Sequence, residues 1–308
     1  MELPLVAPAP VVTEHAGVFR DLFDNQCQFR HFQHYLTGLI VLPNKSLAHM
    51  ARGILDSADQ THLSRLLSEA PWREAEVNRR RVQFRLQQTK PHRRRRRDSL
   101  VVIDDTLCEH VGGLFDYVDR HYNHGNGTYP LAHNPVTSFS VSGPVRFPLG
   151  LRLYRRDEES TQWEACVAKH CPELKIPPDQ KARNRVHKQV DPVWLQDPEC
   201  RARHEPFRTN IAMAIDLVEE AIRHKVPCGV VVFDAWYLAE ELVQVWARRR
   251  KDWMSLLKKN RLLETANFHL RDANGWAMQL PSPHIAVEEL VPLIPAPAYR
   301  PVTAGDHT

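Results

Sequence analysis

The sequence predicts an α/β fold, a mixed sheet with flanking helices, preceded by a small all-helical domain. Two observations support this prediction. Apolar residues recur at helical spacing over residues 17–88, whereas short apolar and β-branched runs appear from residue 100 onward. The order expected after residue 100 is three strands, a helix, a strand, a helix and a strand, which is typical of a sheet covered by helices.

The N-terminal part of the chain is expected to be a helical DNA-binding domain. Residues 1–16 are rich in proline and alanine, which predicts a disordered N-terminus. Aromatic residues from Phe19 to Tyr35 lie on one helical stripe, and three further stripes follow up to Leu86. Short helices beside arginine clusters are typical of small DNA-binding domains, so we expect this role for residues 17–90. A helical dimerisation or packing module would show the same pattern.

Basic residues are clustered although the net charge is only +4. Residues 92–97 read HRRRRR, within a proline-broken segment, 91–99, that we expect to be a basic linker. Phosphate backbones attract such clusters through counterion release, although a solvated linker has the same composition. The residues expected to contact DNA are Arg79, Arg80, Arg81, Arg93, Arg94, Arg95, Arg96, Arg97, Lys258, Lys259 and Arg261.

The composition argues against a membrane or secreted protein. No apolar run approaches the roughly 18 residues that a membrane helix needs, and no basic region precedes an apolar stretch at the N-terminus. We therefore expect a cytoplasmic protein, associated with the nucleoid when bound to DNA. The six cysteines form no CxxC pair and are expected to be free thiols.

Two groups of residues are of metal-binding types but match no common zinc pattern. Cys166, His170 and Cys171 are close in sequence, and an ordinary set of buried or free thiols is the alternative. A polar loop could likewise bind a metal or hold satisfied polar groups through its three histidines, His121, His124 and His133.

Two aspartates end apolar runs, Asp104 after VVI and Asp234 after VVVF. A carboxylate at the end of a buried strand is costly unless something compensates its charge. In the expected order of elements the two strands can be parallel neighbours about 4.8 Å apart, which would bring the carboxylates within about 5 Å. Mg²⁺ or Mn²⁺ would keep both ionised, and a complete site would hold two ions. Alternatively, each aspartate caps the turn after its strand.

The motifs around these aspartates resemble the DDE-type transposases of bacterial insertion sequences, the DDE superfamily endonuclease group, whose core is ribonuclease H-like. The resemblance covers most of residues 17–262. The similar stretches are FRHFQHYLTGLIVLPNKSLAHMA, VVIDDT, VRFPLGLRLYRR, FRTNIAMAIDLVEEAI, VPCGVVVFDAWY and WMSLLKKNRLL.

The resemblance implies a metal-dependent catalytic core over residues 100–262. Asp104 and Asp234 would be catalytic residues and metal ligands, with Asp105 as the alternative for the first. The resemblance implies double-stranded DNA, at element ends and target, as the partner, and it allows a homo-oligomer on DNA. Support roles would fall to Thr106 and Tyr237.

The sequence departs from the family at the third acid, a glutamate on a helix with a Tyr, Arg, Glu, Lys pattern. No such pattern follows residue 262, and residues 263–308 look like the truncated start of a β-rich insertion. Glu264, Glu288 and Glu289 are poor substitutes because nothing around them matches that helix.

Three functions stay open at this point. The first is an incomplete DNA transposase that cleaves and transfers strands of an insertion sequence. The second is a non-catalytic DNA-binding fragment that pairs with or interferes with a full-length transposase. The third is a ribonuclease H-like nuclease unrelated to transposition, which the helical N-terminal domain disfavours.

Overall fold

The structure is a computed structural model that describes residues 4–55, 59–112, 116–123, 125–267, 271 and 282–294. The chain divides into two compact units, Met1–Pro91 and His92–Thr308. None of the described helices is long and apolar enough to cross a membrane.

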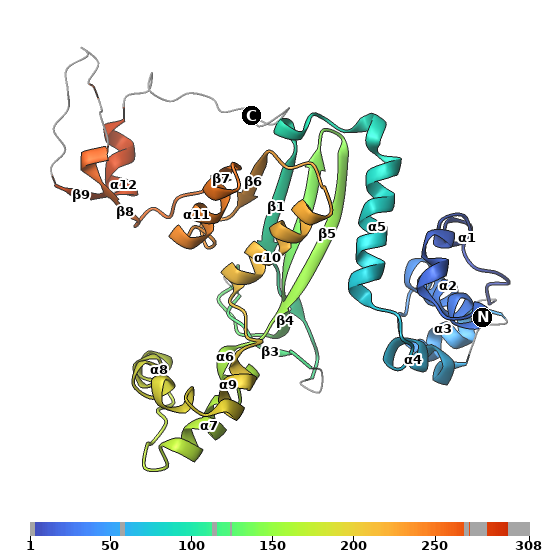
Figure 1. Ribbon diagram of the computed structural model, residues 1–308, viewed down its shortest axis with the longest axis horizontal. Coiled ribbons are helices and arrows are strands. Elements are labelled where there is room, and N and C mark those ends of the chain that lie inside the picture. Colours follow the sequence, from blue (N-terminus) through green and yellow to red (C-terminus); the bar gives the residue numbers. More distant parts are fainter. Residues whose placement is uncertain are drawn as a thin grey trace. The chain divides into compact units, whose positions relative to one another are not determined.

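The first unit is helical. Its elements are α1 (Pro10–His15), the 3-10 helix η1 (Ala16–Leu22), α2 (Gln26–Val41), α3 (Leu47–Gly53), α4 (Gln60–Ser68) and α5 (Glu74–Gln88) (Figure 1). Asn25, Ser46 and Asp59 precede α2, α3 and α4, and each side chain accepts a backbone N–H bond from the first turn. The expected disorder of residues 1–16 is wrong for α1, because Val12 is buried in a cluster of aromatic side chains.

The second unit is built on a mixed sheet. Its strands are β1 (Leu100–Asp105), β2 (Cys108–Glu109), β3 (Asp119–Arg120), β4 (Leu131–Ser142), β5 (Val145–Tyr154), β6 (Val230–Phe233) and β7 (Asp252–Ser255). β4 lies between β5 and β1 and is antiparallel to both, whereas β1, β6 and β7 are parallel. β2 and β3 pair with the beginning of β4. The predicted ribonuclease H-like mixed sheet is confirmed by this topology.

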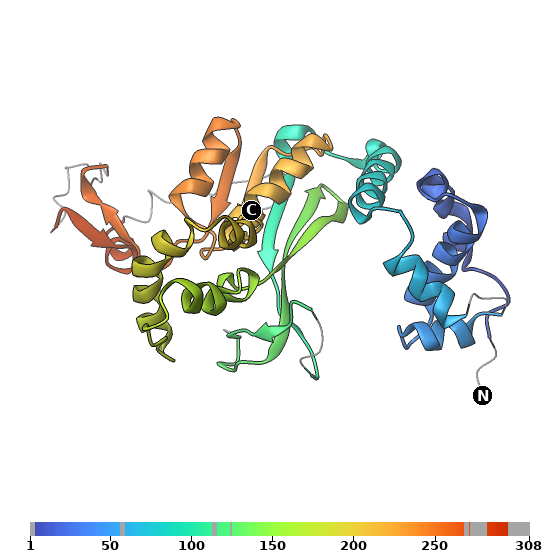
Figure 2. The ribbon, with the colours of Figure 1, turned by 60° about the horizontal axis from the view of Figure 1, so that its bottom comes forward.

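Helices pack against this sheet (Figure 2). α10 (Asn210–Arg223) lies on β4 and β5, and an ion pair between Arg152 and Glu220 joins it to β5. α11 (Glu240–Arg248) connects β6 to β7 and buries Leu242 and Trp246. The buried side chains of α10 recur at helical spacing: Met213, Ala214, Leu217, Val218 and Ala221.

The arginine-rich segment before β1 is anchored on the second unit. It contains two 3-10 turns, η2 (Lys90–His92) and η3 (Arg96–Asp98). The backbone N–H of Arg94 donates to Ser142 Oγ at 3.0 Å, and the buried Ser99 hydroxyl lies 2.7 Å from the same oxygen. Residues 94–99 are therefore not the free linker that the sequence suggested, although the side chains of residues 94–97 are exposed.

Between β5 and α10 the chain forms a helical insertion, residues 157–204, that its weak periodicity did not predict. Figure 1 shows its helices gathered near β3, to which Arg156 is joined through Asp119 (Nε to Oδ2, 2.8 Å). The insertion has an apolar cluster of its own, made of Trp163, Cys166, Val167, Val190, Trp194 and Cys200. Its helices are α6 (Asp157–Ser160), α7 (Trp163–His170), α8 (Gln180–Trp194) and α9 (Pro198–His204).

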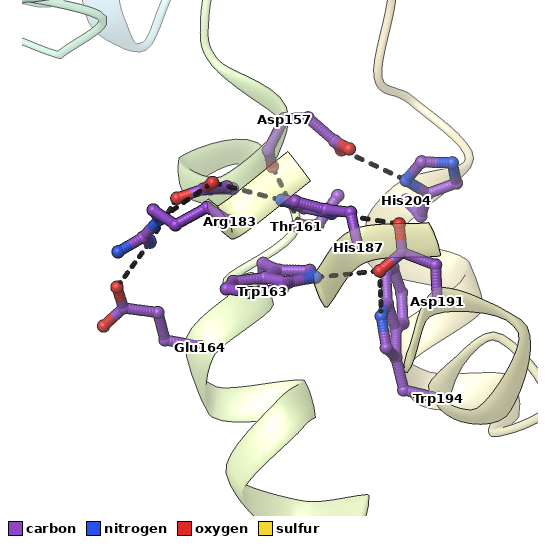
Figure 3. Close-up of polar contacts among 10 residues, drawn as sticks. Asp157, Thr161, Trp163, Glu164, Arg183, His187, Asp191, Trp194 and His204 are labelled. Atoms are coloured by element: carbon purple, nitrogen blue, oxygen red, sulfur yellow. Dashed lines mark hydrogen bonds and ion pairs between the residues drawn. The ribbon is translucent and has the colours of Figure 1, made fainter. Parts of the chain in front are cut away.

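A polar network around Asp191 organises this insertion (Figure 3). Asp191 Oδ1 accepts hydrogen bonds from the indole N–H groups of Trp163 at 2.9 Å and Trp194 at 2.7 Å. Asp191 Oδ2 lies 3.0 Å from His187 Nδ1, whose ring stacks on Trp163. The other ring nitrogen of His187 lies 3.1 Å from Glu158. The network joins α6, α7 and α8. Its polar groups are hydrogen-bonded to one another, as buried polar groups in folded proteins usually are.

After β7 the described residues form a second, small sheet. β8 (Leu262–Glu264) pairs antiparallel with β9 (His284–Ala286). The short elements beside them are η4 (Thr265–Asn267), α12 (Val287–Leu290) and η5 (Val291–Leu293). Much of the β-rich insertion expected over residues 263–308 lies outside the described residues.

Candidate active site

Asp104 and Asp234 follow two adjacent parallel strands. The register pairs Ile103 of β1 with Phe233 of β6, and each aspartate is the next residue along its chain segment. This register places both aspartates at the same edge of the sheet, at the ends of neighbouring strands. Both residues are exposed. The predicted parallel pairing of the two strands is confirmed.

The charge of Asp234 acts on Asp104. Partial desolvation raises the pKa of Asp104 above its ordinary value, and the nearby charge of Asp234 adds to this rise. The backbone N–H of Asp105 donates to Asp104 Oδ1 at 3.0 Å, and this hydrogen bond lowers the pKa of Asp104. A carboxylate whose ionisation is opposed by a neighbouring carboxylate favours a cation between the two.

Asp105 is directed to a different partner, the hydroxyl of Tyr237. This hydroxyl donates to Asp105 Oδ1 at 3.0 Å, and Tyr237 is fully buried. Burial raises the pKa of Asp105, and the Tyr237 hydroxyl lowers it in part. Burial and the charge of Asp105 also hold the pKa of Tyr237 well above its ordinary value. The structure thus joins two residues that the sequence placed in one site without a contact between them.

The turn after β6 is fixed by Asp234 itself. Its Oδ1 atom accepts the backbone N–H groups of Trp236 at 2.7 Å and Tyr237 at 3.4 Å. The turn-capping role considered from the sequence therefore holds for this aspartate. The same turn places Tyr237 opposite Asp105, so capping and site construction are compatible.

Thr137 of β4 holds the end of β1. Its hydroxyl donates to the Asp104 carbonyl at 3.0 Å, and it faces Asp104 in the antiparallel register. Thr106 contributes through its backbone N–H, which donates to the Pro135 carbonyl at 3.2 Å. Sequence reasoning missed Thr137, because only the register of β1 against β4 reveals its position.

Two of the three basic residues after β7 lie against the turn that follows Asp234. The Lys258 ammonium lies 4.6 Å from the centre of the Trp236 ring. The Arg261 guanidinium donates to the Leu238 carbonyl at 2.7 Å. Positive charge beside an acidic edge fits a polyanionic backbone that must approach the carboxylates. Trp236, which is 56% exposed, was not singled out from the sequence.

The arginines of α5 are engaged within the first unit. Arg80 donates to both carboxylate oxygens of Asp21, at 3.0 and 2.8 Å, and to a backbone carbonyl. Arg79 pairs with Glu76, and Arg81 donates to Asn78. These contacts all lie within the helical unit.

Candidate metal ligands outside the aspartate site are grouped differently from the sequence expectation. Among the described residues, His170 is joined by Asp197 and Cys200, with ligand atoms all within 4.8 Å of one another, and Cys171 is not part of this group. In the polar loop, the ring nitrogen Nδ1 of His133 lies 2.7 Å from Nε2 of His110, a residue that the sequence did not single out. His124 lies outside the described residues.

Comparisons with known proteins point to one family. A family model described as DDE superfamily endonuclease matches residues 18–274, a range that includes both aspartate motifs. A relative from Microchaete diplosiphon, named "Probable transposase for insertion sequence element IS701", is 27% identical over 156 residues. The match covers 50% of this chain and 40% of that relative, so the chain spans about two fifths of the relative's length.

Proposed function

Because the chain belongs to the DDE superfamily endonuclease family, we propose that it is a DNA transposase that uses Asp104 and Asp234 for strand cleavage and transfer of an insertion sequence. The observation that carries the proposal is the register that puts both aspartates directly after paired residues of β1 and β6. The similarity to the IS701 relative supports an insertion-sequence substrate.

Membership of this family implies a divalent metal, and the residues present fit one. Asp104 and Asp234 offer oxygen ligands, which Mg²⁺ and Mn²⁺ prefer. A cation would offset the effect of the Asp234 charge on Asp104. When bound, such metals activate the attacking oxygen and neutralise charge on the leaving oxygen of a phosphodiester. The protein's own contribution is to hold the backbone of Asp104 through the Thr137 hydroxyl, and the Asp234 carboxylate through the turn of residues 234–237.

We place the contacts to the DNA backbone at two exposed basic groups of the second unit. One is the tract of residues 94–97, and the other consists of Lys258, Lys259 and Arg261. The backbone of the tract is already held by Ser142 and Ser99. Binding therefore orders side chains only, which lowers the entropy cost of the complex.

We propose further that these 308 residues supply two of the three acids that the family uses. Among the described residues, the charges of Asp104 and Asp234 act on Asp105, which is held by Tyr237. The sequence also lacks the Tyr, Arg, Glu, Lys pattern of the third acid. Without the third acid, a bound metal would have one protein ligand fewer and a less fixed position. A misplacement of about 1 Å can lower a rate on the order of a hundredfold. We therefore expect this chain to bind DNA and cut it weakly.

The first experiment measures metal binding and DNA cutting on the full chain. Mn²⁺ binding is followed by electron paramagnetic resonance, and nicking of supercoiled DNA is followed in Mg²⁺ and Mn²⁺. The variants are Asp104→Asn, Asp234→Asn and the double variant, with Asp252→Asn as the control at an exposed residue of β7.

We expect the double variant to lose Mn²⁺ binding and the control to keep it, with DNA binding intact in both. Unchanged Mn²⁺ binding in the double variant would overturn the aspartate assignment. Strong Mg²⁺-dependent nicking that Asp234→Asn abolishes would keep the assignment and overturn the proposal of a missing acid.

A further inference from the structure

Three side chains with metal-binding atoms, those of His170, Asp197 and Cys200, converge inside the helical insertion, and a fourth, Cys166, interacts with Cys200. Cys166 and His170 are four residues apart and lie on one face of α7. Asp197 caps the start of α9, and Cys200 follows one turn later. The ligand atoms of His170, Asp197 and Cys200 all lie within 4.8 Å of one another. The Cys166 thiol is not part of this group. It donates to the Thr161 carbonyl oxygen at 3.8 Å and interacts with the Cys200 thiol, so Cys166 would have to turn toward the other three to become the fourth ligand.

The surroundings of this cluster differ on its two sides. Cys166 and Cys200 are buried in the apolar cluster of the insertion. The side chains of His170 and Asp197 are 26% and 13% exposed, so the cluster has an apolar inner side and a polar outer side. Two sulfurs, one imidazole nitrogen and one carboxylate oxygen suit zinc, which takes four such ligands in a tetrahedral arrangement. Mg²⁺ prefers oxygen ligands alone, so this donor set is chemically distinct from the aspartate pair.

We propose that Cys166, His170, Asp197 and Cys200 form a structural zinc site that joins α7 to α9. Four protein ligands fill a tetrahedral shell, which is the mark of a structural site and not of a catalytic one. The paired spacings, four residues on α7 and three on α9, each bring two ligands to one face of a helix.

The contacts of Asp197 show what changes on binding. Its Oδ2 atom lies 2.8 Å from His170 Nε2 and 2.6 Å from Lys169 Nζ. The metal takes the place of these hydrogen bonds on the carboxylate, while Lys169 keeps its ion pair with Glu199 at 3.2 Å. Each thiol gives up its proton to solvent when its sulfur binds the metal. Because both thiols must release their protons, zinc affinity falls as the pH is lowered.

Purified full-length protein provides the test. The chain is produced with zinc supplementation under reducing conditions, and its metal content is measured by inductively coupled plasma mass spectrometry. Co²⁺ substitution then reports the ligands, because a tetrahedral thiolate site gives a charge-transfer band and intense visible bands. The variants are Cys166→Ser, Cys200→Ser and His170→Ala, and the matched control is Cys228→Ser, at a buried cysteine of the sheet unit.

We expect about one zinc ion per chain, and an affinity loss of more than about tenfold in each ligand variant but not in the control. A chelator should lower the melting temperature of the wild type and leave that of Cys200→Ser unchanged. Clearly substoichiometric zinc, or a Co²⁺ spectrum without thiolate bands in the wild type, overturns the proposal. Loss of both thiols to a disulfide in the reduced, zinc-supplemented protein also overturns it. None of these readouts depends on DNA cleavage.

Discussion

Replacing Tyr237 by phenylalanine removes one hydroxyl group from the interior of the candidate site. The side chain is fully buried and donates to Asp105 Oδ1 at 3.0 Å. A hydrogen bond to a charged group contributes about 1.5–3 kcal/mol to stability. Asp105 is only half-buried, so water replaces part of the lost bond, and we expect the lower end, about 1.5 kcal/mol. In a domain of about 200 residues this lowers the melting temperature by roughly 3–6 °C.

The pH dependence of this loss follows from the ionisation of Asp105. Its pKa in the folded state is raised above the ordinary value of 3.8, so the folded protein holds this proton to higher pH than the unfolded chain does. Ionisation of Asp105 therefore costs stability as the pH rises through the raised pKa. The Tyr237 hydroxyl favours the ionised form, and its removal raises the pKa further. The stability difference between wild type and variant is thus largest above the pKa of Asp105 and shrinks in acid.

The assay is urea unfolding of wild type, Tyr237→Phe, Asp105→Asn and the double variant, at about pH 7 and about pH 4. We expect a coupling free energy of about 1 kcal/mol between the two positions near neutral pH, and less in acid. Tyr129→Phe is the control, because Tyr129 is 59% exposed. A coupling below about 0.3 kcal/mol, or a Tyr237→Phe effect that is the same at both pH values, would refute the contact as a charge-assisted hydrogen bond.

Three other variants, one with five substitutions and two with one each, test separate parts of the structure. Replacing residues 93–97 by alanine should reduce the slope of log affinity against log salt by several units, since each neutralised phosphate contributes about 0.9; an unchanged slope in fluorescence anisotropy would show no phosphate contact. Asp191→Ala leaves two indole N–H groups without their acceptor and should cost about 2–5 kcal/mol in urea unfolding, and a loss below about 1 kcal/mol contradicts the network. Gly229→Ala puts a Cβ atom 2.3 Å from the Arg97 carbonyl oxygen and should cost about 1–3 kcal/mol, so an unchanged melting temperature would argue against the anchored tract.

Parts of the sheet and its helices can be predicted from the sequence where the pattern of apolar residues within one segment is sufficient. β1 and β6 are contiguous apolar runs, and α10 repeats its apolar residues at helical spacing, so each could be located without knowing its partners. The N-terminal helix α1 was missed because proline and alanine suggested disorder. Pro10 occupies its first turn, where a proline is well tolerated.

The helical insertion could not be predicted in the same way. Its cluster joins Trp163 to Trp194 and Cys200, which are far apart in sequence, and Pro192 lies inside α8, where the pattern predicts a break. The acids at the strand ends were accessible from sequence, whereas the contact of Tyr237 with Asp105 spans 132 residues. Such contacts depend on strand register and turn geometry, which no single segment encodes.

The helical insertion, with its own apolar cluster and its own network around Asp191, has a consequence for local unfolding. Segments stabilised mainly by internal contacts open as cooperative units at their own free energy. Backbone amides of α7 and α8 should therefore exchange with solvent deuterium as one block, separately from those of β1 and β6. The insertion can open and reclose while the strands that carry the two aspartates stay paired.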